Sequence, residues 1–332
     1  MEINTLAKAD LESKNVLLRA GFDVPLENGQ IADDRRIKAT FPTMNEIFKK
    51  GASSLTIITH IGRPDGKVEP NLSVAPIREY IEKNYSQKVT VLENLRFDNR
   101  EEGNDFEFAR QIANGFEVYV QDAFSNLHRA HASMVQIPKI LPTYAGLLVQ
   151  NEILNLRKIS ENPQKPFVVI VGGAKAETKI PLIEKLKQMA DWILIGGKTA
   201  NEIIETKKYQ GATNVILPVD GIKDENGQTR DIGKQTISIF KNKMKTAKTI
   251  FWNGNLGQTE KKEYLNGSKE IARFLCDLPN DAFVAVGGGD TAELMDKLIL
   301  CKRIEFVSTG GGASLAFIAG EKLPGLEALN YK

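Results

Sequence analysis

A glycine-rich segment that follows a short apolar stretch has the clearest chemical potential in this sequence. Within residues 283–294, four apolar residues lead into glycines 287–289, which are followed by Asp290, Thr291 and a helical pattern. Glycines at a strand-to-helix turn let a ligand approach the backbone, and the helix N-terminus adds free N–H groups and partial positive charge. This pattern favours a phosphate or carboxylate site with Asp290 as an oxygen ligand for Mg²⁺. The alternative is a turn that only packs the helix on its strand.

The glycine-rich pattern recurs in the second half of the chain. Glycines follow the predicted strands 167–171, 192–195 and 304–307, and Lys175 and Lys179 come soon after the first of them. Backbone amides and lysines together suit a nucleotide polyphosphate. The recurrence therefore favours ligand binding over simple packing.

Cationic side chains follow the predicted strands of the first half instead. Four arginines lie at or just past strand ends, a fifth lies early in the first predicted helix, and all three histidines of the chain lie in the same loops. These residues are Arg19, Arg63, Arg96, Arg129, Arg36, His60, His128 and His131. Because ligands bind at the carboxyl ends of strands in open α/β sheets, we expect the cations to converge on a small, multiply charged anion. The alternative for each arginine is a solvated surface charge.

Alternating strands and helices would position both groups of residues. Apolar strand-like segments such as 55–59 and 117–121 are separated by helical patterns such as 35–50. The alternation resumes at Phe167, after a predicted connecting helix at 146–160. This order predicts an α/β fold in two halves.

The bulk composition narrows the class of protein. The chain has 332 residues, 42% hydrophobic and 26% charged, with a formal net charge of +2. These values are typical of globular proteins and give no reason to expect nucleic acid or membrane as a partner. The N-terminal residues lack the apolar core of a signal peptide, and no apolar run approaches membrane-spanning length. The only cysteines, Cys276 and Cys301, show no metal-site spacing, so we expect two reduced, structural thiols in a cytoplasmic protein.

The two halves together favour phosphoryl transfer. Cations in one half would hold a small anionic substrate, and glycine turns in the other would hold a nucleotide. Phosphoryl transfer needs mainly positioning and charge neutralisation from the protein. The sequence has no GxxxxGK[ST] motif and no protein-kinase motifs, and the absence of GxGxxG argues against an ordinary dinucleotide enzyme.

Nine segments resemble the phosphoglycerate kinase family, in the family's order and over nearly the full length. The segments are VPLENGQIADDRRIKATFPTM (24–44), HIGRP (60–64), LENLRF (92–97), DAFSNLHRAHAS (122–133), GGAKAETKI (172–180), LPVD (217–220), FWNGNLG (251–257), GGGDT (287–291) and STGGGASLAFIAGEKLPGLEAL (308–329). The resemblance implies two Rossmann-like α/β domains with mainly parallel sheets, joined by a hinge helix. It implies an N-terminal substrate domain of residues 1–146, to which 320–332 return, and a C-terminal nucleotide-binding domain of residues 147–319.

The resemblance also implies a reaction and its residues. The reaction is the reversible, Mg²⁺-dependent transfer of a phosphoryl group between 1,3-bisphosphoglycerate and ADP, giving 3-phosphoglycerate and ATP in glycolysis, by a hinge-bending monomer. The implied substrate-binding residues are Asp23, Arg36, His60, Arg63, Arg96 and Arg129. The implied nucleotide-binding residues are Gly172, Gly173, Lys175, Lys179, Gly196, Asn253, Glu260, Gly288, Gly289, Asp290 and Thr291, with Asp290 as the metal anchor. The implied catalytic residues are Arg36, Lys175, Gly311 and Gly312.

The chain departs from the family pattern after its first predicted strand. Gly21 and Asp23 stand where the family has an aspartate and an asparagine that contact substrate. Asp23 either replaces the lost carboxylate or repels an anionic substrate by placing like charge beside it. Further departures are Lys198, Thr178, Asn255 and a gap after Tyr209, where a helix is expected. Two alternatives therefore stand beside a working kinase: an enzyme with altered substrate or nucleotide choice, and a non-catalytic relative of the same fold.

Overall fold

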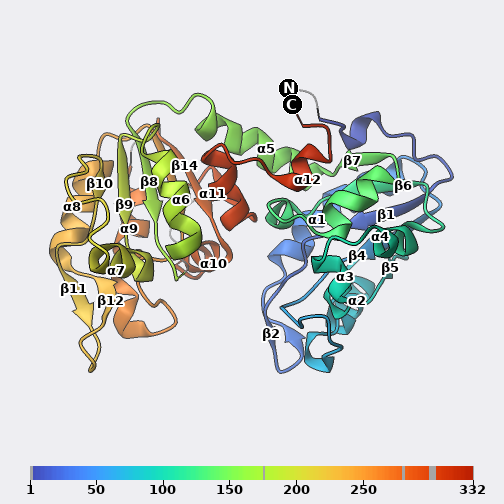
Figure 1. The fold of residues 1–332 in the computed structure, drawn as a ribbon, viewed down its shortest axis with the longest axis horizontal. Coiled ribbons are helices and arrows are strands. Elements are labelled where there is room, and N and C mark those ends of the chain that lie inside the picture. The colour runs from blue at the N-terminus through green and yellow to red at the C-terminus, as the bar shows by residue number, and fades with distance from the viewer. Residues whose placement is uncertain (1–2, 175, 279–280, 299–303, 332) are drawn as a thin grey trace. The chain divides into compact units, whose positions relative to one another are not determined.

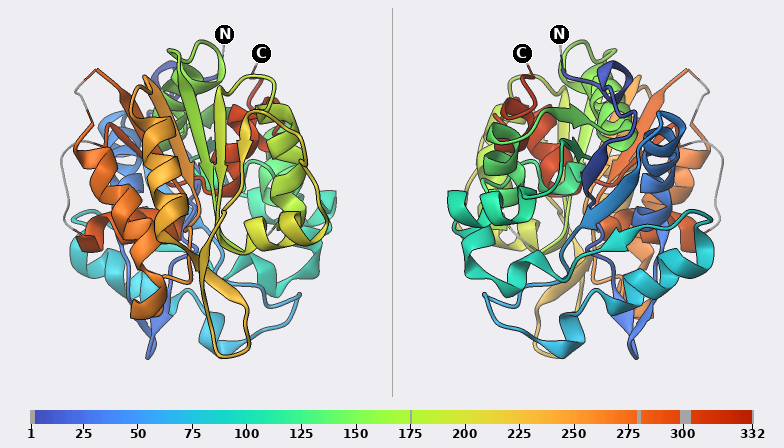
Figure 2. Two further views of the ribbon diagram at one scale, coloured as in Figure 1. Left: turned by 90° about the vertical axis from the view of Figure 1, so that its left-hand side faces the viewer. Right: turned by 90° about the vertical axis from the view of Figure 1, so that its right-hand side faces the viewer.

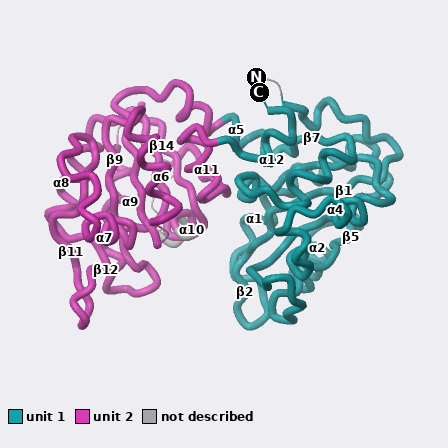
Figure 3. Tube along the Cα trace, viewed as in Figure 1, with its two compact units in different colours: residues 1–154, 322–332 teal, residues 155–321 magenta. Residues whose placement is uncertain are grey.

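The computed structural model describes residues 3–174, 176–278, 281–298 and 304–331 (Figure 1). The chain divides into two compact units, one of residues 1–154 and 322–332 and the other of residues 155–321 (Figure 3). The predicted boundaries of a substrate domain and a nucleotide domain stay predictions, because compactness assigns no ligand to either unit.

The first unit contains a sheet of five parallel strands in the order β5-β4-β1-β6-β7. Counted along the chain within this sheet, the order is 3-2-1-4-5, so it reverses between β1 and β6. In open α/β sheets this reversal is where ligands bind, beyond the carboxyl ends of the strands. The strands are β1 (Asn15–Arg19), β4 (Ser54–Ile58), β5 (Thr90–Val91), β6 (Val118–Gln121) and β7 (Thr143–Ala145).

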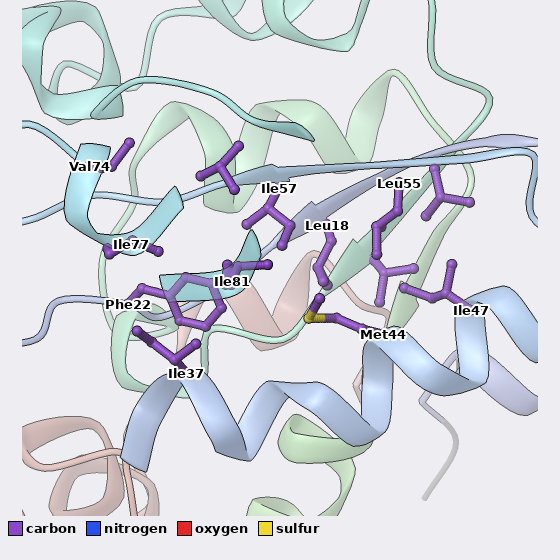
Figure 4. Close-up of a cluster of buried hydrophobic side chains, with 14 of the residues drawn as sticks. Leu18, Phe22, Ile37, Met44, Ile47, Leu55, Ile57, Val74, Ile77 and Ile81 are labelled. Carbon is purple, nitrogen blue, oxygen red and sulfur yellow. The ribbon is translucent and has the colours of Figure 1, made fainter. Parts of the chain in front are cut away.

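Helices cover both faces of this sheet. Helix α1 (Arg35–Lys49) buries Ile37, Met44 and Ile47 against residues of one face that include Leu18 (Figure 4). Leu17, which precedes Leu18 in β1, faces the opposite side of the sheet, where helix α4 (Phe106–Ala113) packs. The other helical elements of this unit are α2 (Ala75–Asn84), α3 (Asn99–Glu102), α4 (Phe106–Ala113), α12 (Pro324–Glu327), η1 (Leu6–Lys8), η2 (Pro70–Leu72), η3 (Leu95–Phe97), η4 (Phe124–Asn126), η5 (Ala132–Gln136) and η6 (Ile137–Lys139), and a small hairpin joins β2 (Leu26–Glu27) to β3 (Gln30–Ile31).

The second unit contains a six-stranded parallel sheet in the order β10-β9-β8-β13-β14-β15. Its order along the chain is 3-2-1-4-5-6, with the reversal between β8 and β13. The register places Asn253 opposite both Val171 and Gly287, and Gly287 opposite Ser308. The strands are β8 (Phe167–Val171), β9 (Trp192–Ile195), β10 (Val215–Ile216), β13 (Thr249–Asn253), β14 (Phe283–Gly287) and β15 (Phe306–Ser308).

Two groups of helices cover this second sheet (Figure 2). Helix α6 contacts α7 and α11, whereas α9 contacts α8 and α10. The helices are α6 (Ala176–Leu186), α7 (Gly197–Glu205), α8 (Lys234–Met244), α9 (Asn266–Cys276), α10 (Gly289–Leu298) and α11 (Gly312–Ile318), with the short η7 (Lys262–Tyr264). An antiparallel hairpin of β11 (Gly221–Lys223) and β12 (Thr229–Ile232) turns at the Asn-Gly pair 226–227.

Helix α5 (Leu147–Ser160) contains the boundary between the two units. Its first turn is capped by the buried Asp122, whose Oδ1 accepts the N–H groups of Leu148 at 3.0 Å and Val149 at 3.3 Å. Burial raises the pKa of Asp122 to about 7. The C-terminal segment returns to the first unit, as the resemblance implies, and Gly325 donates its N–H to the carbonyl of Leu127 at 2.9 Å.

The α/β class and the mainly parallel sheets confirm the predicted fold class. Helix α6 begins at Ala176, about one turn before its large apolar residues start at Ile180. Helices α8 and α9 lie in stretches where no element was predicted. The predicted gap is confirmed, since only turns connect the end of α7 at Glu205 to Val215.

The expectation of reduced thiols is wrong. Cys276, the last residue of α9, is disulfide-bonded, and Cys301 lies outside the described residues. The spacing of two cysteines in a sequence does not show whether the fold brings them together, so the sequence alone could not decide this. Among the described residues, no helix has both the length and the apolar character needed to cross a membrane.

Candidate functional site

Arg19 is the buried cation at the carboxyl end of β1, with only 1% of its surface exposed. Its Nε donates to Ser133 Oγ at 3.1 Å, its Nη2 lies 2.9 Å from His60 Nδ1, and its Nη1 donates to the carbonyl of Ala20. Burial lowers the pKa of Arg19, but a guanidinium keeps its charge in proteins. A full positive charge is thus held at the strand end by fixed partners.

Glu101 is the buried counter-charge of Arg19, and Ser133 connects the two. The backbone N–H of Ser133 donates to Glu101 Oε2 at 2.9 Å, and its hydroxyl donates to Oε1 at 2.6 Å. Glu101 is 1% exposed and also lies 3.9 Å from His131 Nδ1. An ionised carboxylate can only accept hydrogen bonds, and a guanidinium can only donate them. The hydrogen bonds therefore run in one direction, from Arg19 to Ser133 and from Ser133 to Glu101.

His60 lies between Arg19 and Asp23. Its Nε2 is 3.9 Å from Asp23 Oδ2, while Asp23 Oδ1 accepts the N–H of Gly62 at 2.9 Å. Burial holds the pKa of His60 well below its usual value, and the charges of Arg19 and other arginines lower it further. His60 is therefore neutral at physiological pH.

Arg36 and Arg96 reach the same loops from α1 and η3. Arg36 is half-buried, and its Nη1 donates to the backbone carbonyl of Asp23 at 2.9 Å. Arg96 donates from Nη1 to the carbonyl of Gly62 at 2.7 Å and pairs through Nε with Glu102 at 3.2 Å. Arg36 therefore holds the loop after β1, and Arg96 holds the loop after β4.

Two buried guanidinium nitrogens in this cluster have no hydrogen-bond partner among the described residues. They are Arg96 Nη2 and Arg129 Nε. A buried donor without an acceptor costs about 1–3 kcal/mol. Burial lowers the pKa of Arg129, and the charges of Arg96 and Arg63 lower it further. Unpaired donors among several like charges fit an anionic ligand with several acceptor oxygens.

The departure at Gly21 and Asp23 has a clear local structure. A Cβ on Gly21 would lie 3.1 Å from Ser125 Oγ, so a side chain there requires a small shift of Ser125. The carboxylate of Asp23 is 43% exposed and interacts electrostatically with Arg19 and Arg96. Its charge is thus surrounded by cations.

The second unit forms its candidate site from backbone at the reversal between β8 and β13. Gly172 donates to the carbonyl of Asn253 at 2.9 Å, and Gly173 donates to that of Asn255 at 2.7 Å. Gly254 has a φ of +92°, and a Cβ there would lie 2.4 Å from the carbonyl oxygen of Gly172. The two turns therefore approach closely only because they lack side chains.

The turns after β14 and β15 join this group through Asn253 and Thr291. Asn253 Nδ2 donates to the carbonyl of Gly311 at 2.9 Å, and Gly254 donates its N–H to Thr291 Oγ1 at 3.0 Å. Gly288 has a φ of +99° beside both side chains. The ends of β8, β13, β14 and β15 thus meet, and helices α6, α10 and α11 begin soon after three of them.

The remaining predicted nucleotide residues have different surroundings. Lys179 donates from Nζ to the carbonyl of Gly172. Gly196 lies against Leu256, where a Cβ would be 2.5 Å from Leu256 Cδ2, and Glu260 is exposed in the loop after β13. Gly289 and Gly312 are the first residues of α10 and α11. Lys175 and the side chain of Asp290 lie outside the described residues.

The donor set of the glycine turns fits a Mg²⁺ ion that arrives with a nucleotide. Among the side chains that the structure describes, no three acidic, histidine or cysteine residues gather in a way that could hold a metal. Mg²⁺ usually keeps several waters and binds through one or two carboxylates plus substrate phosphates. Free N–H groups at helix starts suit those phosphates.

The chain is similar to one protein family over nearly its full length. The model of the family described as "Phosphoglycerate kinase" matches residues 6–91, 78–216 and 205–321. This chain belongs to the phosphoglycerate kinase family. The phosphoglycerate kinase of Thermosipho africanus is 35% identical over 399 aligned residues, covering 100% of this chain and 99% of that protein. The phosphoglycerate kinase of Fervidobacterium nodosum is also 35% identical, over 398 residues.

Solved structures of phosphoglycerate kinases share the fold. That from Coxiella burnetii has a TM-score of 0.80 at 30% identity, and that from Pyrococcus horikoshii has a TM-score of 0.84 at 27% identity. In both cases, 99% of each chain is covered. The fold and the family predicted from the sequence are thereby confirmed.

The structure adds residues that the predicted site omits. The sequence places Arg19 and His131 among the cations expected to converge on an anion, but the resemblance does not include them among the substrate-binding residues. It gives Glu101 and Ser133 no role. For Arg19, its position as the last residue of a buried strand was the available signal. For Glu101, no local signal existed, because its partner Ser133 is 32 residues away.

Proposed function

We propose that this member of the phosphoglycerate kinase family catalyses the reversible, Mg²⁺-dependent transfer of a phosphoryl group between 1,3-bisphosphoglycerate and ADP, which gives 3-phosphoglycerate and ATP. Full-length similarity to phosphoglycerate kinases supports the reaction. The observation in this chain that carries the proposal is a pair of buried donors, Arg96 Nη2 and Arg129 Nε, for which the described part of the chain offers no acceptor.

The arginines of the first unit are proposed to hold the phosphoglycerate. Arg63, Arg96 and Arg129 would bind the phosphate that does not react, because forked N–H donors match phosphate oxygens. Arg36, at the start of α1, would neutralise the phosphoryl group that is transferred. Asp23 would supply the carboxylate that Gly21 lacks, since the cations around it offset its charge.

The glycine turns of the second unit are proposed to hold the nucleotide. Gly288 and Gly289 would donate N–H groups to the phosphates. Gly172 and Gly173, whose own N–H groups donate to the carbonyls of Asn253 and Asn255, would let the phosphates approach the backbone closely, with Lys179 beside them. Asn253, Thr291, Gly196 and Glu260 would complete the nucleotide site, and Gly311, Gly312 and Lys175 would act on the transferring group. Asp290 would anchor Mg²⁺, which would supply positive charge to neutralise the phosphates.

The protein's part in this chemistry is positioning and charge neutralisation. The phosphoryl group passes between the acyl carboxylate oxygen of the glycerate and the terminal phosphate oxygen of ADP, roughly in line. Transfer requires the two ligands to meet, so we propose that the reaction includes a domain movement around α5. We also propose that the enzyme works as a cytoplasmic monomer.

A coupled assay with 3-phosphoglycerate and MgATP tests the proposal. We expect turnover. No turnover by a chain that still binds MgADP in calorimetry would contradict it and would favour the non-catalytic alternative, which no comparison supports. Turnover restored by Gly21→Asp together with Asp23→Asn would locate the defect at the end of β1.

A further inference from the structure

We propose that Arg19 is a positioning residue that fixes His60 as a neutral imidazole with its proton on Nε2. His60 would then offer the substrate an N–H donor instead of a positive charge. The identity of the substrate rests on the proposed function, whereas the state of His60 follows from hydrogen-bond directions within the protein.

The contact between Arg19 and His60 has only one allowed direction. Arginine has five N–H donors and no acceptor. Arg19 Nη2 lies 2.9 Å from His60 Nδ1, so Nδ1 must be the acceptor and carry no proton. A neutral imidazole that accepts at Nδ1 carries its proton on Nε2. The other tautomer, or the imidazolium, would place two N–H groups against each other.

Arg19 is held too firmly to turn away from His60. Its Nε is committed to Ser133 Oγ, and its Nη1 is committed to the carbonyl of Ala20. Ser133 cannot change its role, because its hydroxyl and its N–H both donate to the carboxylate of Glu101. Arg19, Ser133, Glu101 and His60 are all at most 1% exposed, so water does not compete for these hydrogen bonds.

The charged groups around His60 favour the same state. They come from β1, the loop that follows it, η3 and the loop after β6. They are Arg19, Asp23, Arg96, Arg129 and His131. Burial and the three arginines oppose protonation of His60, and Asp23 is the one acid among these groups.

The Nε2–H of His60 keeps its capacity to bind a ligand. The nearest acid oxygen, Asp23 Oδ2, is 3.9 Å away, which is longer than a hydrogen bond. The side chain of Asp23 is 43% exposed, so this nitrogen faces the more open side of the cluster. The arginines therefore supply the positive charge of the site, and the neutral His60 supplies an N–H donor that points in a fixed direction.

Nuclear magnetic resonance on the full-length, ligand-free chain tests the assignment. The chain has three histidines, and His60→Gln identifies the signals of His60 in long-range ¹H–¹⁵N spectra. We expect a protonated Nε2 and an unprotonated Nδ1 that do not change between about pH 5.5 and 8. A proton on Nδ1, or a titration of His60 within that range, would overturn the proposal. The exposed His128 serves as an internal comparison.

Arg19→Lys tests the role of Arg19, because lysine keeps the charge but has all its donors on one nitrogen, whereas Arg19 reaches its three acceptors from three nitrogens. We expect His60 to lose its fixed tautomer and the KM for 3-phosphoglycerate to rise about tenfold. Arg110→Lys, on the exposed face of α4, is the matched control. An unchanged His60 spectrum in Arg19→Lys would overturn the role of Arg19, and if that variant does not fold, the spectrum of the unmodified chain decides. The expected spectrum in a chain without turnover would contradict only the proposed function.

Discussion

The two units form their proposed anion-binding sites from different parts of the polypeptide. In the first unit, the groups are side chains, and their geometry depends on buried partners such as Glu101 and Ser133. In the second unit, the groups are backbone amides, and their geometry depends on glycines such as Gly254 that allow two turns to approach. A site of the first kind fails when a charge is removed, whereas a site of the second kind fails when a methyl group is added.

The difference fits the two proposed ligands. A small substrate that carries most of its charge on few atoms is held best by forked, charged donors. A nucleotide polyphosphate extends over several strand ends and is held well by amides and helix N-termini. A substitution in one unit should therefore damage the proposed site of that unit and leave the other site intact.

Removing the charge of Arg36 should give the largest effect. We expect Arg36→Ala to lower kcat roughly 10³-fold, with a smaller change in KM, because the charge is needed mainly in the transition state. Arg35→Ala, which loses an ion pair with Asp33 instead, is the matched control. Steady-state kinetics with both substrates would show it, and an effect confined to KM would reassign Arg36 to ground-state binding.

Glu101→Gln should damage the first unit without any contact to ligand. It removes the buried counter-charge of Arg19 and sets an amide N–H₂ beside Ser133, so we expect a loss of about 3 kcal/mol in the free energy of unfolding. Denaturant unfolding measures it. Glu107→Gln on exposed α4 should change stability by less than about 0.5 kcal/mol. Equal stability of both variants would show that the buried pair does not organise this site.

Gly254→Ala tests the second unit by adding one methyl group. The new Cβ would lie 2.4 Å from the carbonyl oxygen of Gly172 at a φ of +92°. We expect a loss of more than about 2 kcal/mol in stability and at least tenfold weaker MgADP binding, while 3-phosphoglycerate binding stays unchanged.

Gly227→Ala provides the control for Gly254→Ala. It has a similar φ of +75° but open space around the Cβ, so it should cost only about 1 kcal/mol. Calorimetry with each ligand distinguishes the outcomes. MgADP binding that survives Gly254→Ala would mean that the close approach of the turns is not required.

The first unit should also depend on pH through His131. Burial and nearby arginines lower the pKa of His131 to about 3, so the folded protein favours the neutral form. The stability that this provides is complete above about pH 6.5 and is lost progressively as the pH falls toward 3. His131→Gln should therefore reduce the loss of stability on acidification. Unfolding curves at several pH values measure this. If the free energy of unfolding falls equally with pH in the unmodified chain and in His131→Gln, His131 does not contribute to the pH dependence.

Asp23→Asn should give the smallest effect and decides between the two interpretations of that residue. Its Oδ1 can still accept from Gly62 after the change. If Asp23 supplies a needed carboxylate, KM for 3-phosphoglycerate should rise about threefold to tenfold. A fall in KM would show instead that Asp23 repels the substrate.

The sequence predicts the frame of both sites better than their details. Strand ends could be located because buried parallel strands are short apolar runs, and cations or glycines directly follow them. The hydrogen bonds that connect Arg19 to Glu101 through Ser133 could not be predicted, because these residues are far apart in the chain. The disulfide at Cys276 and the helices α8 and α9 were missed for a related reason, since tertiary contacts override weak local patterns.

Hydrogen–deuterium exchange on the full-length chain tests most directly whether the first unit binds 3-phosphoglycerate and the second unit binds MgADP. With 3-phosphoglycerate alone, we predict protection of the first-unit loops at 60–64, 94–97 and 122–133. With MgADP alone, we predict protection of the second-unit turns at 172–174, 253–257 and 287–291. Protection of the second unit's turns by 3-phosphoglycerate, or of the first unit's loops by MgADP alone, would contradict the account.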